Sequence, residues 1–140
     1  MIVEDDADDQ SLLHEILSDS GIDNELISFP NGAEALEHLL NAAEVPSLII
    51  CDINMPLMNG VEFRRRIHDH EGLRKKCIPF VFLTTTAEPV TVSIAYKLNV
   101  QGFFEKKNTY EALRHQLHQI IGYWSNCLQP SSFASASKKF

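Results

Sequence analysis

Short apolar runs alternate along this chain with amphipathic stretches. A short apolar run bounded by polar or turn residues is typical of a strand that is buried on both faces of a sheet. In the longer stretches between the runs, apolar residues recur at intervals of three and four, which predicts helices with one buried face. We expect strands at residues 2–3 (the end of a first strand), 25–28, 48–52, 79–83 and 100–104.

Five helices are predicted between and after these strands. Asn31 is a candidate N-cap, Pro89 suits a first helical turn, and Asn108 can form a capping box with Glu111. Pro130 is expected to end the last helix. The predicted helices span about 9–20, 33–43, 61–67, 89–98 and 108–130, with a polar loop at 69–76.

The alternation of strands and helices predicts an α/β fold. Connections of this kind place the strands parallel in one sheet with helices on both faces, a doubly wound, three-layer α/β/α arrangement. No internal repeat or interdomain linker interrupts the 140 residues, which suit one domain. We expect this domain at 1–128 and a mobile tail at 129–140. The first strand is very short, unless the natural chain begins earlier.

Composition narrows the function classes. A hydrophobic content of 44% and a charged content of 22% are those of a soluble globular domain. A net charge of −7 disfavours a nucleic-acid surface, because phosphate contacts need an excess of Lys and Arg. Cys51, Cys77 and Cys127 lack the spacing of a zinc site and are expected to be reduced thiols in a cytoplasmic protein. No apolar run approaches the ~20 residues of a membrane helix, so no membrane association is expected.

Conspicuous polar residues follow four of the five predicted strands. Glu4 and Asp5 come after the first strand, and Asp52 ends the third. Thr84 marks the end of the fourth strand, and Lys106 follows the fifth. The carboxyl ends of parallel strands meet at one edge of the sheet, where ligands bind in open α/β folds. We therefore expect these five side chains to share one crevice.

Three carboxylates in one crevice repel one another unless a cation neutralises them. A few carboxylates with room for water and a nearby phosphoryl group suit Mg²⁺. A lysine and a hydroxyl across the crevice would bind the oxygens of a tetrahedral oxyanion, and one carboxylate can act as a nucleophile and become an acyl phosphate. For Asp8 and Asp9, a solvated, acidic helix start is an equal alternative to a role in the site.

Four motifs carry a resemblance to a known family, at 3–6 (VEDD), 51–60 (CDINMPLMNG), 82–84 (FLT) and 102–106 (GFFEK). On these motifs the chain resembles the receiver domain of two-component response regulators over roughly residues 2–123. The resemblance implies a flavodoxin-like fold with strand order 2-1-3-4-5. It also implies a signalling domain and not an enzyme, since such a domain catalyses only the phosphorylation and dephosphorylation of its own aspartate.

The resemblance implies an aspartyl phosphate at Asp52. The donor would be a phosphohistidine on a sensor histidine kinase or a phosphotransfer protein, and a downstream protein would read the result. The expected cofactor is Mg²⁺, bound directly by Asp5 and Asp52 and by the backbone carbonyl of Asn54, with Glu4 acting through water.

In the family, a threonine, a lysine and an aromatic residue respond to the phosphoryl group. By resemblance, Thr84 turns toward that group and Lys106 pairs with it. Phe103 would then rotate inward and change the face made by helix four, strand five and helix five. This is a two-state packing switch biased by a new charge. An ordinary half-buried strand aromatic is the alternative interpretation of Phe103.

Three residues depart from the family pattern. Lys107 stands where the family usually has a proline after a cis peptide bond, and a cis bond before another residue type costs about 2.5–4 kcal/mol. We expect a trans bond or a remodelled loop, which would shift Lys106. Thr85 replaces a small residue and would narrow access to the phosphoryl group, while Glu4 is one methylene longer than the usual Asp.

The long last helix resembles that of stand-alone receivers associated with bacterial phytochrome kinases. Such receivers often pair as homodimers through the face of helix four, strand five and helix five. Trp124 either belongs to an interface of this kind, where aromatic residues are enriched, or packs on its own domain.

Other functions compete with this one. A receiver-like module that binds proteins without phosphate is favoured by Lys107 and opposed by the intact set of acids, hydroxyl and lysine. A phosphatase that works through an aspartyl phosphate needs a general acid two residues after its nucleophile, where this chain has Asn54. A flavin-binding function needs a phosphate loop rich in Ser, Thr and Gly after the first strand, where this chain has acids.

Overall fold

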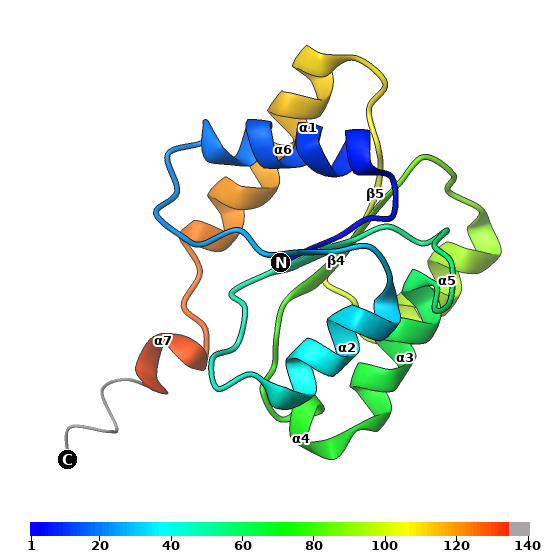
Figure 1. The fold of residues 1–140 in the computed structure, drawn as a ribbon, viewed down its shortest axis with the longest axis vertical. Coiled ribbons are helices and arrows are strands. Elements are labelled where there is room, and N and C mark those ends of the chain that lie inside the picture. Colours follow the sequence, from blue (N-terminus) through cyan, green and yellow to red (C-terminus); the bar gives the residue numbers. More distant parts are fainter. Residues whose placement is uncertain (135–140) are drawn as a thin grey trace.

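In the computed structural model, which describes residues 1–134, five strands form one sheet with helices on both faces (Figure 1). The strands are β1 (Ile2–Val3), β2 (Ser28–Phe29), β3 (Ile49–Cys51), β4 (Phe80–Thr84) and β5 (Gly102–Glu105). Their order across the sheet is β2-β1-β3-β4-β5, and every neighbouring pair is parallel. The predicted α/β fold and the strand order implied by the resemblance are confirmed.

The described chain has seven helical segments, of which five correspond to the predicted helices. They are α1 (Ala7–Ser18), α2 (Gly32–Asn41), α3 (Gly60–Asp69), α4 (Glu71–Arg74), α5 (Pro89–Lys97), α6 (Tyr110–Ser125) and α7 (Ser131–Ala134). Helices α1 and α6 cover one face of the sheet, and α2, α3 and α5 cover the other (Figure 1). Within residues 1–134, no helix is long and apolar enough to cross a membrane.

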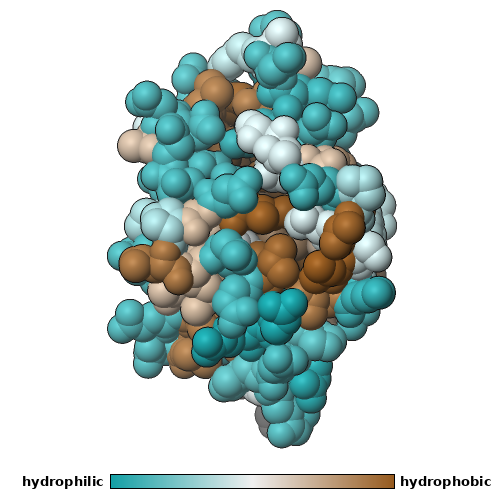
Figure 2. Space-filling model, turned by 90° about the vertical axis from the view of Figure 1, so that its right-hand side faces the viewer, coloured by the Kyte–Doolittle hydropathy of each residue, from teal (hydrophilic) through white to brown (hydrophobic). Residues whose placement is uncertain are grey.

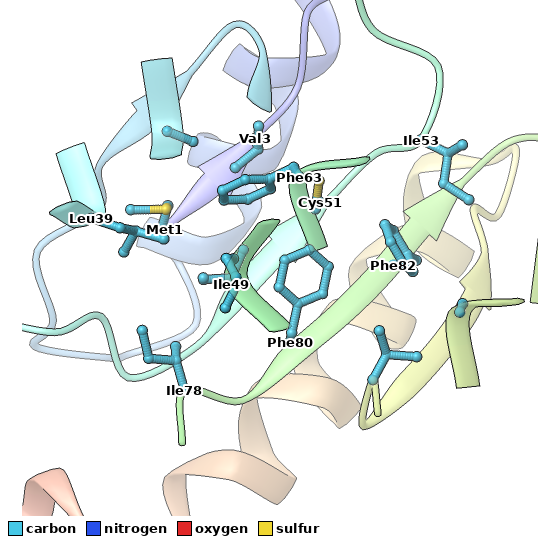
Figure 3. Packing of buried hydrophobic residues seen from close by; sticks show 14 of the residues in the cluster. Met1, Val3, Leu39, Ile49, Cys51, Ile53, Phe63, Ile78, Phe80 and Phe82 are labelled. Atoms are coloured by element: carbon cyan, nitrogen blue, oxygen red, sulfur yellow. The ribbon is translucent and has the colours of Figure 1, made fainter. Parts of the chain in front are cut away.

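Two apolar cores form because alternate residues of each strand face opposite sides of the sheet. On the side of α1 and α6, Ile50 and Val81 belong to the same buried cluster as Leu117. On the other side, Phe63 of α3 packs against Phe80 of β4, with ring centroids 5.7 Å apart (Figure 3). Since β3 and β4 are buried on both sides, the loops at their carboxyl ends start from rigid positions.

The strand ends differ from the prediction. The range 25–28 is wrong for the second strand, because only Ser28–Phe29 pairs; this strand lies at the edge of the sheet and has one neighbour. The third strand is shorter than 48–52, so that Asp52 lies just beyond it. The fourth and fifth strands start later than predicted and run on together until Thr84 pairs with Glu105.

Capping side chains account for differences at the helix ends. Helix α1 begins before residue 9, because the Asp6 carboxylate accepts the backbone N–H of Asp9 at 2.9 Å. The predicted cap of α6, Asn108, is wrong: the hydroxyl of Thr109 accepts the N–H of Ala112 instead. In both cases the helix begins directly after the residue whose side chain forms the cap.

Two short helices lie where irregular chain is predicted. The predicted loop 69–76 contains α4, whose N-cap is His70. Helix α6 ends at Ser125, before the predicted end at 130, and α7 follows within the predicted tail 129–140. The rest of that tail, 135–140, lies outside the described residues. The predicted cap Asn31 and the Pro89 start of α5 are confirmed.

Candidate functional site

The carboxylates of Glu4, Asp5 and Asp52 meet at the carboxyl edge of the sheet. Strands β1 and β3 are neighbours and Val3 pairs with Cys51, so the residues that follow them lie side by side. Each acid offers one oxygen, and these oxygens all lie within 4.8 Å of one another. Glu4 is buried, Asp52 is half-buried and Asp5 is exposed. Oxygen ligands at this spacing, with one side open to water, fit a hard divalent cation.

Glu4 is the buried member of these three acids. Loss of hydration raises the pKa of Glu4 to about 7; the charge of Lys106 lowers that pKa, and the charge of Asp52 raises it. Oε1 of Glu4 accepts the backbone N–H of Asp6 at 3.2 Å, and Oε2 accepts the Lys106 ammonium at 3.1 Å. A cation held by the acids would favour the charged form of Glu4.

Lys106 enters the same crevice from the end of β5. Its backbone N–H donates to the Thr84 carbonyl at 2.7 Å. Its ammonium donates to Glu4 Oε2 at 3.1 Å and to Asp9 Oδ2 at 3.2 Å, and its side chain is 8% exposed. Burial acts to lower the pKa of Lys106, but the charges and hydrogen bonds of Glu4 and Asp9 outweigh burial and raise it. Within residues 1–134, no ion pair joins Lys106 to Asp52.

Gln116 of α6 holds the backbone on both sides of Lys106. Its side-chain N–H donates to the Glu105 carbonyl at 2.9 Å, and its side-chain oxygen accepts the N–H of Lys107 at 3.3 Å. The peptide bond between Lys106 and Lys107 is trans, as predicted. A proline at position 107 would have no N–H for Gln116 to accept. Lys106 therefore reaches the acids in a loop held by a glutamine.

The hydroxyl of Thr84 is buried without a hydrogen-bond partner. Thr84 is the last residue of β4 and is 0% exposed. Its Oγ1 is one of two buried side-chain polar atoms left unpaired in the part of the chain that the structure describes. An unpaired buried group of this kind costs about 1–3 kcal/mol. Because the Thr84 carbonyl binds the backbone of Lys106, this hydroxyl belongs to a residue at the edge of the same crevice.

The loop after Asp52 closes tightly onto α3. The N–H of Gly60 donates to the Ile53 carbonyl at 2.9 Å. The N–H of Ile53 donates to Asp52 Oδ1 at 2.7 Å, which orients the carboxylate. Asn54 lies two residues beyond Asp52 and is exposed, between the buried Ile53 and Met55. The structure thus places Asp52 at the base of a short loop with its side chain held by its own backbone.

Phe103 lies on β5, on the side of the sheet covered by α5. It is half-buried, and its ring packs against Phe82 of the neighbouring strand with centroids 5.7 Å apart. This contact is compatible with both interpretations of the residue, so that its role as a switch stays a prediction.

The model of the response regulator receiver domain family matches residues 1–118. This chain belongs to that family. Receiver domains serve as phosphoacceptors in signalling and are not enzymes in the ordinary sense. They interact with histidine kinases or phosphotransfer proteins and with downstream targets, and they bind divalent metal ions.

This receiver domain is 32% identical over 129 residues to the response regulator Rcp1 of Synechocystis sp., with 89% of this chain and 86% of Rcp1 covered. It is 28% identical to the chemotaxis protein CheY1 of Helicobacter pylori, over 87% of this chain and 95% of CheY1. The crystal structure of the phosphorylated cyanobacterial phytochrome response regulator RcpA has a TM-score of 0.84 at 27% identity, covering 92% of this chain and 95% of RcpA. The Mn²⁺-bound form of Rcp1 has a TM-score of 0.83 at 30% identity, covering 92% and 96%.

Two residues reach the receiver site from helices: the sequence leaves the role of Asp9 open, and it does not predict Gln116 as part of the site. Asp9 binds the ammonium of Lys106, and Gln116 binds the backbone around it. The spacing of Asp6 and Asp9 is typical of a helix N-cap and the third residue of the helix, and it places Asp9 in the first turn of α1. Gln116 has no such signal, because a glutamine on an amphipathic helix is recognised as functional only through the groups it meets.

Proposed function

We propose that this receiver domain accepts a phosphoryl group on Asp52 from a phosphohistidine of a sensor histidine kinase or a phosphotransfer protein. The observation that carries the proposal is the meeting of three carboxylates, one ammonium and one unpaired hydroxyl at a single edge of the sheet. Among the acids, Asp52 is half-buried and oriented by the N–H of Ile53, which suits a nucleophile that must approach phosphorus from one direction.

In the proposed reaction, an oxygen of Asp52 attacks phosphorus and the bond from phosphorus to the donor histidine breaks. The imidazole leaves with the electron pair and takes up a proton, and the product is a mixed anhydride of phosphate and carboxylate. Attack of water on phosphorus later breaks the bond between phosphorus and the Asp52 oxygen, which releases inorganic phosphate and regenerates the carboxylate. When bound, a Mg²⁺ ion neutralises negative charge on the phosphoryl oxygens. The groups that would hold this ion are Asp5, Asp52, the backbone carbonyl of Asn54 and, through water, Glu4.

Lys106 and Thr84 are proposed to bind the new phosphoryl group. An ammonium and a hydroxyl supply charge-assisted hydrogen bonds to its oxygens, and Thr84 Oγ1 has no partner among the described residues that it would have to leave. Movement of Thr84 would let Phe103, which packs on Phe82, turn further inward. The change would alter the face made by α5, β5 and α6, and a downstream protein would read it.

The same face is proposed to form a homodimer. A groove of about 570 Å³ lies between β5 and α6, and its walls include Phe104, Ile120, Tyr123 and Trp124. Trp124 packs partly on its own domain and also lines this groove. Figure 2, which faces the side on which α5 lies in Figure 1, shows hydrophobic side chains gathered in the middle of that side among hydrophilic ones. Apolar and aromatic groups of this kind suit the centre of a protein interface.

The proposal places the receiver domain at residues 1–128 and the protein in the cytoplasm. The three cysteines are free thiols, of which Cys51 is buried in the core, and free thiols suit a reducing compartment.

The test is phosphorylation of the purified protein by a small phosphodonor such as acetyl phosphate, followed by intact mass. The wild type should gain one phosphoryl group when Mg²⁺ is present and none after chelation. Asp52→Ala should gain none, because the nucleophile is missing. Asp69→Ala is the matched control: it removes an exposed aspartate from the far end of α3 and should leave the gain unchanged.

No gain in the wild type, or an equal gain in Asp52→Ala, would contradict the proposal. A receiver-like module that binds proteins without phosphate is the second candidate, favoured by Lys107 at the position where the family usually has proline. It would give no gain in any variant while Asp52→Ala still binds its protein partner.

A further inference from the structure

The ammonium of Lys106 has a carboxylate partner outside the three acids at the sheet edge. Besides Glu4, it binds Oδ2 of Asp9 at 3.2 Å. Asp9 does not belong to the group of acids whose oxygens lie close enough together to hold a metal ion. It comes from α1 and not from a strand end, and its side chain is 43% exposed. An acid in this position can act on Lys106 without being a metal ligand.

The position of Asp9 follows from the start of α1. Its backbone N–H donates to the Asp6 carboxylate at 2.9 Å, so the first turn of the helix is fixed and the Asp9 side chain lies against the segment after β5. Asp9, Thr85 and Lys106 line a cavity of about 260 Å³ between α1 and that segment. The contact therefore forms at the wall of an open space, in which the lysine side chain has room to change its direction.

We propose that Asp9 is a positioning residue that competes with the phosphoryl group for the ammonium of Lys106 and so stabilises the unphosphorylated state. This inference rests on the function proposed above. An ammonium has three N–H donors, and in the structure one goes to Glu4 and one to Asp9. A phosphoryl group on Asp52 must draw the ammonium away from these two carboxylate partners. The strength of the Asp9 contact then sets part of the equilibrium between the two states.

The effect of Asp9 on the equilibrium between the two states can be tested separately, whereas that of Glu4 cannot. Removing Glu4 would change the acids proposed to act on the metal and the ammonium at once. Removing the charge of Asp9 weakens one charge-assisted hydrogen bond to Lys106 and leaves the acids at the strand ends in place. Lys106 would still be held by Glu4 and by the backbone bonds around it, so its general position should persist.

Asp9→Asn tests this proposal, with Asp8→Asn as the matched control. Both variants remove one negative charge from the first turn of α1, but Asp8 is exposed and forms no ion pair within residues 1–134. The measurement is the affinity of each protein for beryllofluoride, a phosphoryl mimic, at a fixed Mg²⁺ concentration. Asp9→Asn should tighten binding about fivefold, the difference between a charged and a neutral hydrogen bond, and Asp8→Asn should change it less than twofold.

A second readout needs no metal. In protein kept in chelator, the ¹H and ¹⁵N NMR signals of the Lys106 ammonium should shift in Asp9→Asn and stay in place in Asp8→Asn. Asp9→Glu keeps the charge and should restore both the signals and the affinity toward wild-type values. Circular dichroism checks that each variant keeps the helical content of the wild type.

Equal tightening in Asp8→Asn and Asp9→Asn would overturn the proposal, because the effect would then be one of net charge. A shifted ammonium signal with unchanged beryllofluoride affinity would overturn it too, since the contact would exist without restraining the lysine. If the wild type itself binds no beryllofluoride, both the proposed function and this inference fail. In the two outcomes above the wild type binds beryllofluoride, so that only the inference about Asp9 fails.

Discussion

Gly60 is the first residue of α3, and it lies against the end of β3, the strand that leads to Asp52. A side chain at this position would collide with its neighbours, because a Cβ would lie 2.1 Å from the Asp52 carbonyl oxygen and 2.9 Å from the Phe82 ring. One of these neighbours is backbone and the other is a fully buried ring, so neither can move without disturbing the core. The close approach of α3 to the proposed phosphoacceptor therefore requires glycine.

Gly60→Ala is expected to lower the free energy of unfolding by about 1–3 kcal/mol, the usual cost of overpacking. Asp52, displaced with its backbone, should also be phosphorylated more slowly. The control is Gly122→Ala in α6, where a Cβ would meet nothing within 4 Å and alanine should stabilise the helix by about 0.5–1 kcal/mol. Urea unfolding and the rate of phosphoryl gain check both variants, and a stable, normally phosphorylated Gly60→Ala would refute the argument.

The residues at strand ends can be predicted from the sequence, whereas for those that reach in from helices the sequence leaves the role of Asp9 open and gives none for Gln116. Asp52 and Lys106 each follow an apolar run, and the topology of a parallel sheet brings such positions together whatever the rotamers of their side chains. Asp9 and Gln116 lie on amphipathic helices, where a polar residue has no local sign of its partner. The pair of Asp9 and Lys106 joins positions 97 residues apart, and only packing brings them into contact.

Among the long helices, α5 has the fewest anchors. Ala95 is its only buried residue, and its N-cap makes no side-chain hydrogen bond. At its other end, Arg64 of α3 donates Nε to the Leu98 carbonyl at 2.8 Å and Nη2 to the Asn99 carbonyl at 3.3 Å. The guanidinium is buried and lies 5.5 Å from the centre of the Phe80 ring. One buried arginine thus ties a helix of the proposed switch face to α3.

Arg64→Leu should therefore loosen α5 selectively. The expected loss is about 2–3 kcal/mol in the free energy of unfolding, because hydrogen bonds from a charged group disappear and two carbonyls lose their partner. Hydrogen exchange should accelerate in α5 more than in α1 or α2. Arg65→Leu is the control: its side chain is 45% exposed and pairs with Glu62 on the surface, so it should cost less than about 1 kcal/mol. Uniform acceleration over all helices would count against the anchoring role.

Helices of more than one turn are predictable because their apolar signal repeats, and a helix of a single turn is not. Each of the five longer helices shows several turns of apolar periodicity, and each predicted strand exists. Helix α4 has only four residues, and its His70 cap carries no pattern that separates it from a polar loop. The edge strand β2 is placed by pairing with β1 and not by its own apolar content, which explains why its predicted range is displaced.

At the scale of the whole molecule, the alternation of strands and helices predicts the parallel α/β fold, and the family resemblance supplies the strand order. Strand–helix–strand connections are right-handed and do not cross, which leaves few arrangements for five strands, and the observed order is one of them. Assembly does not follow in this way, because an interface depends on which side chains the finished surface exposes. The groove between β5 and α6 meets the proposed dimer face, and it contains the exposed Tyr123 with its ring against Trp124, centroids 5.0 Å apart.

If that face joins two copies, the mass in solution should respond to the phosphoryl mimic. Light scattering after size exclusion, with and without beryllofluoride and Mg²⁺, should show a mass about twice that of the monomer in at least one state. Tyr123→Glu should give a monomer in both states, because a charge in the centre of an apolar interface must lose its hydration. Leu40→Glu places the same charge on an exposed apolar residue of α2, near the opposite edge of the sheet, and should leave assembly unchanged. A wild type that is monomeric in both states would exclude the dimer. The face would then bind a different protein partner, and that binding should be lost in Tyr123→Glu and kept in Leu40→Glu.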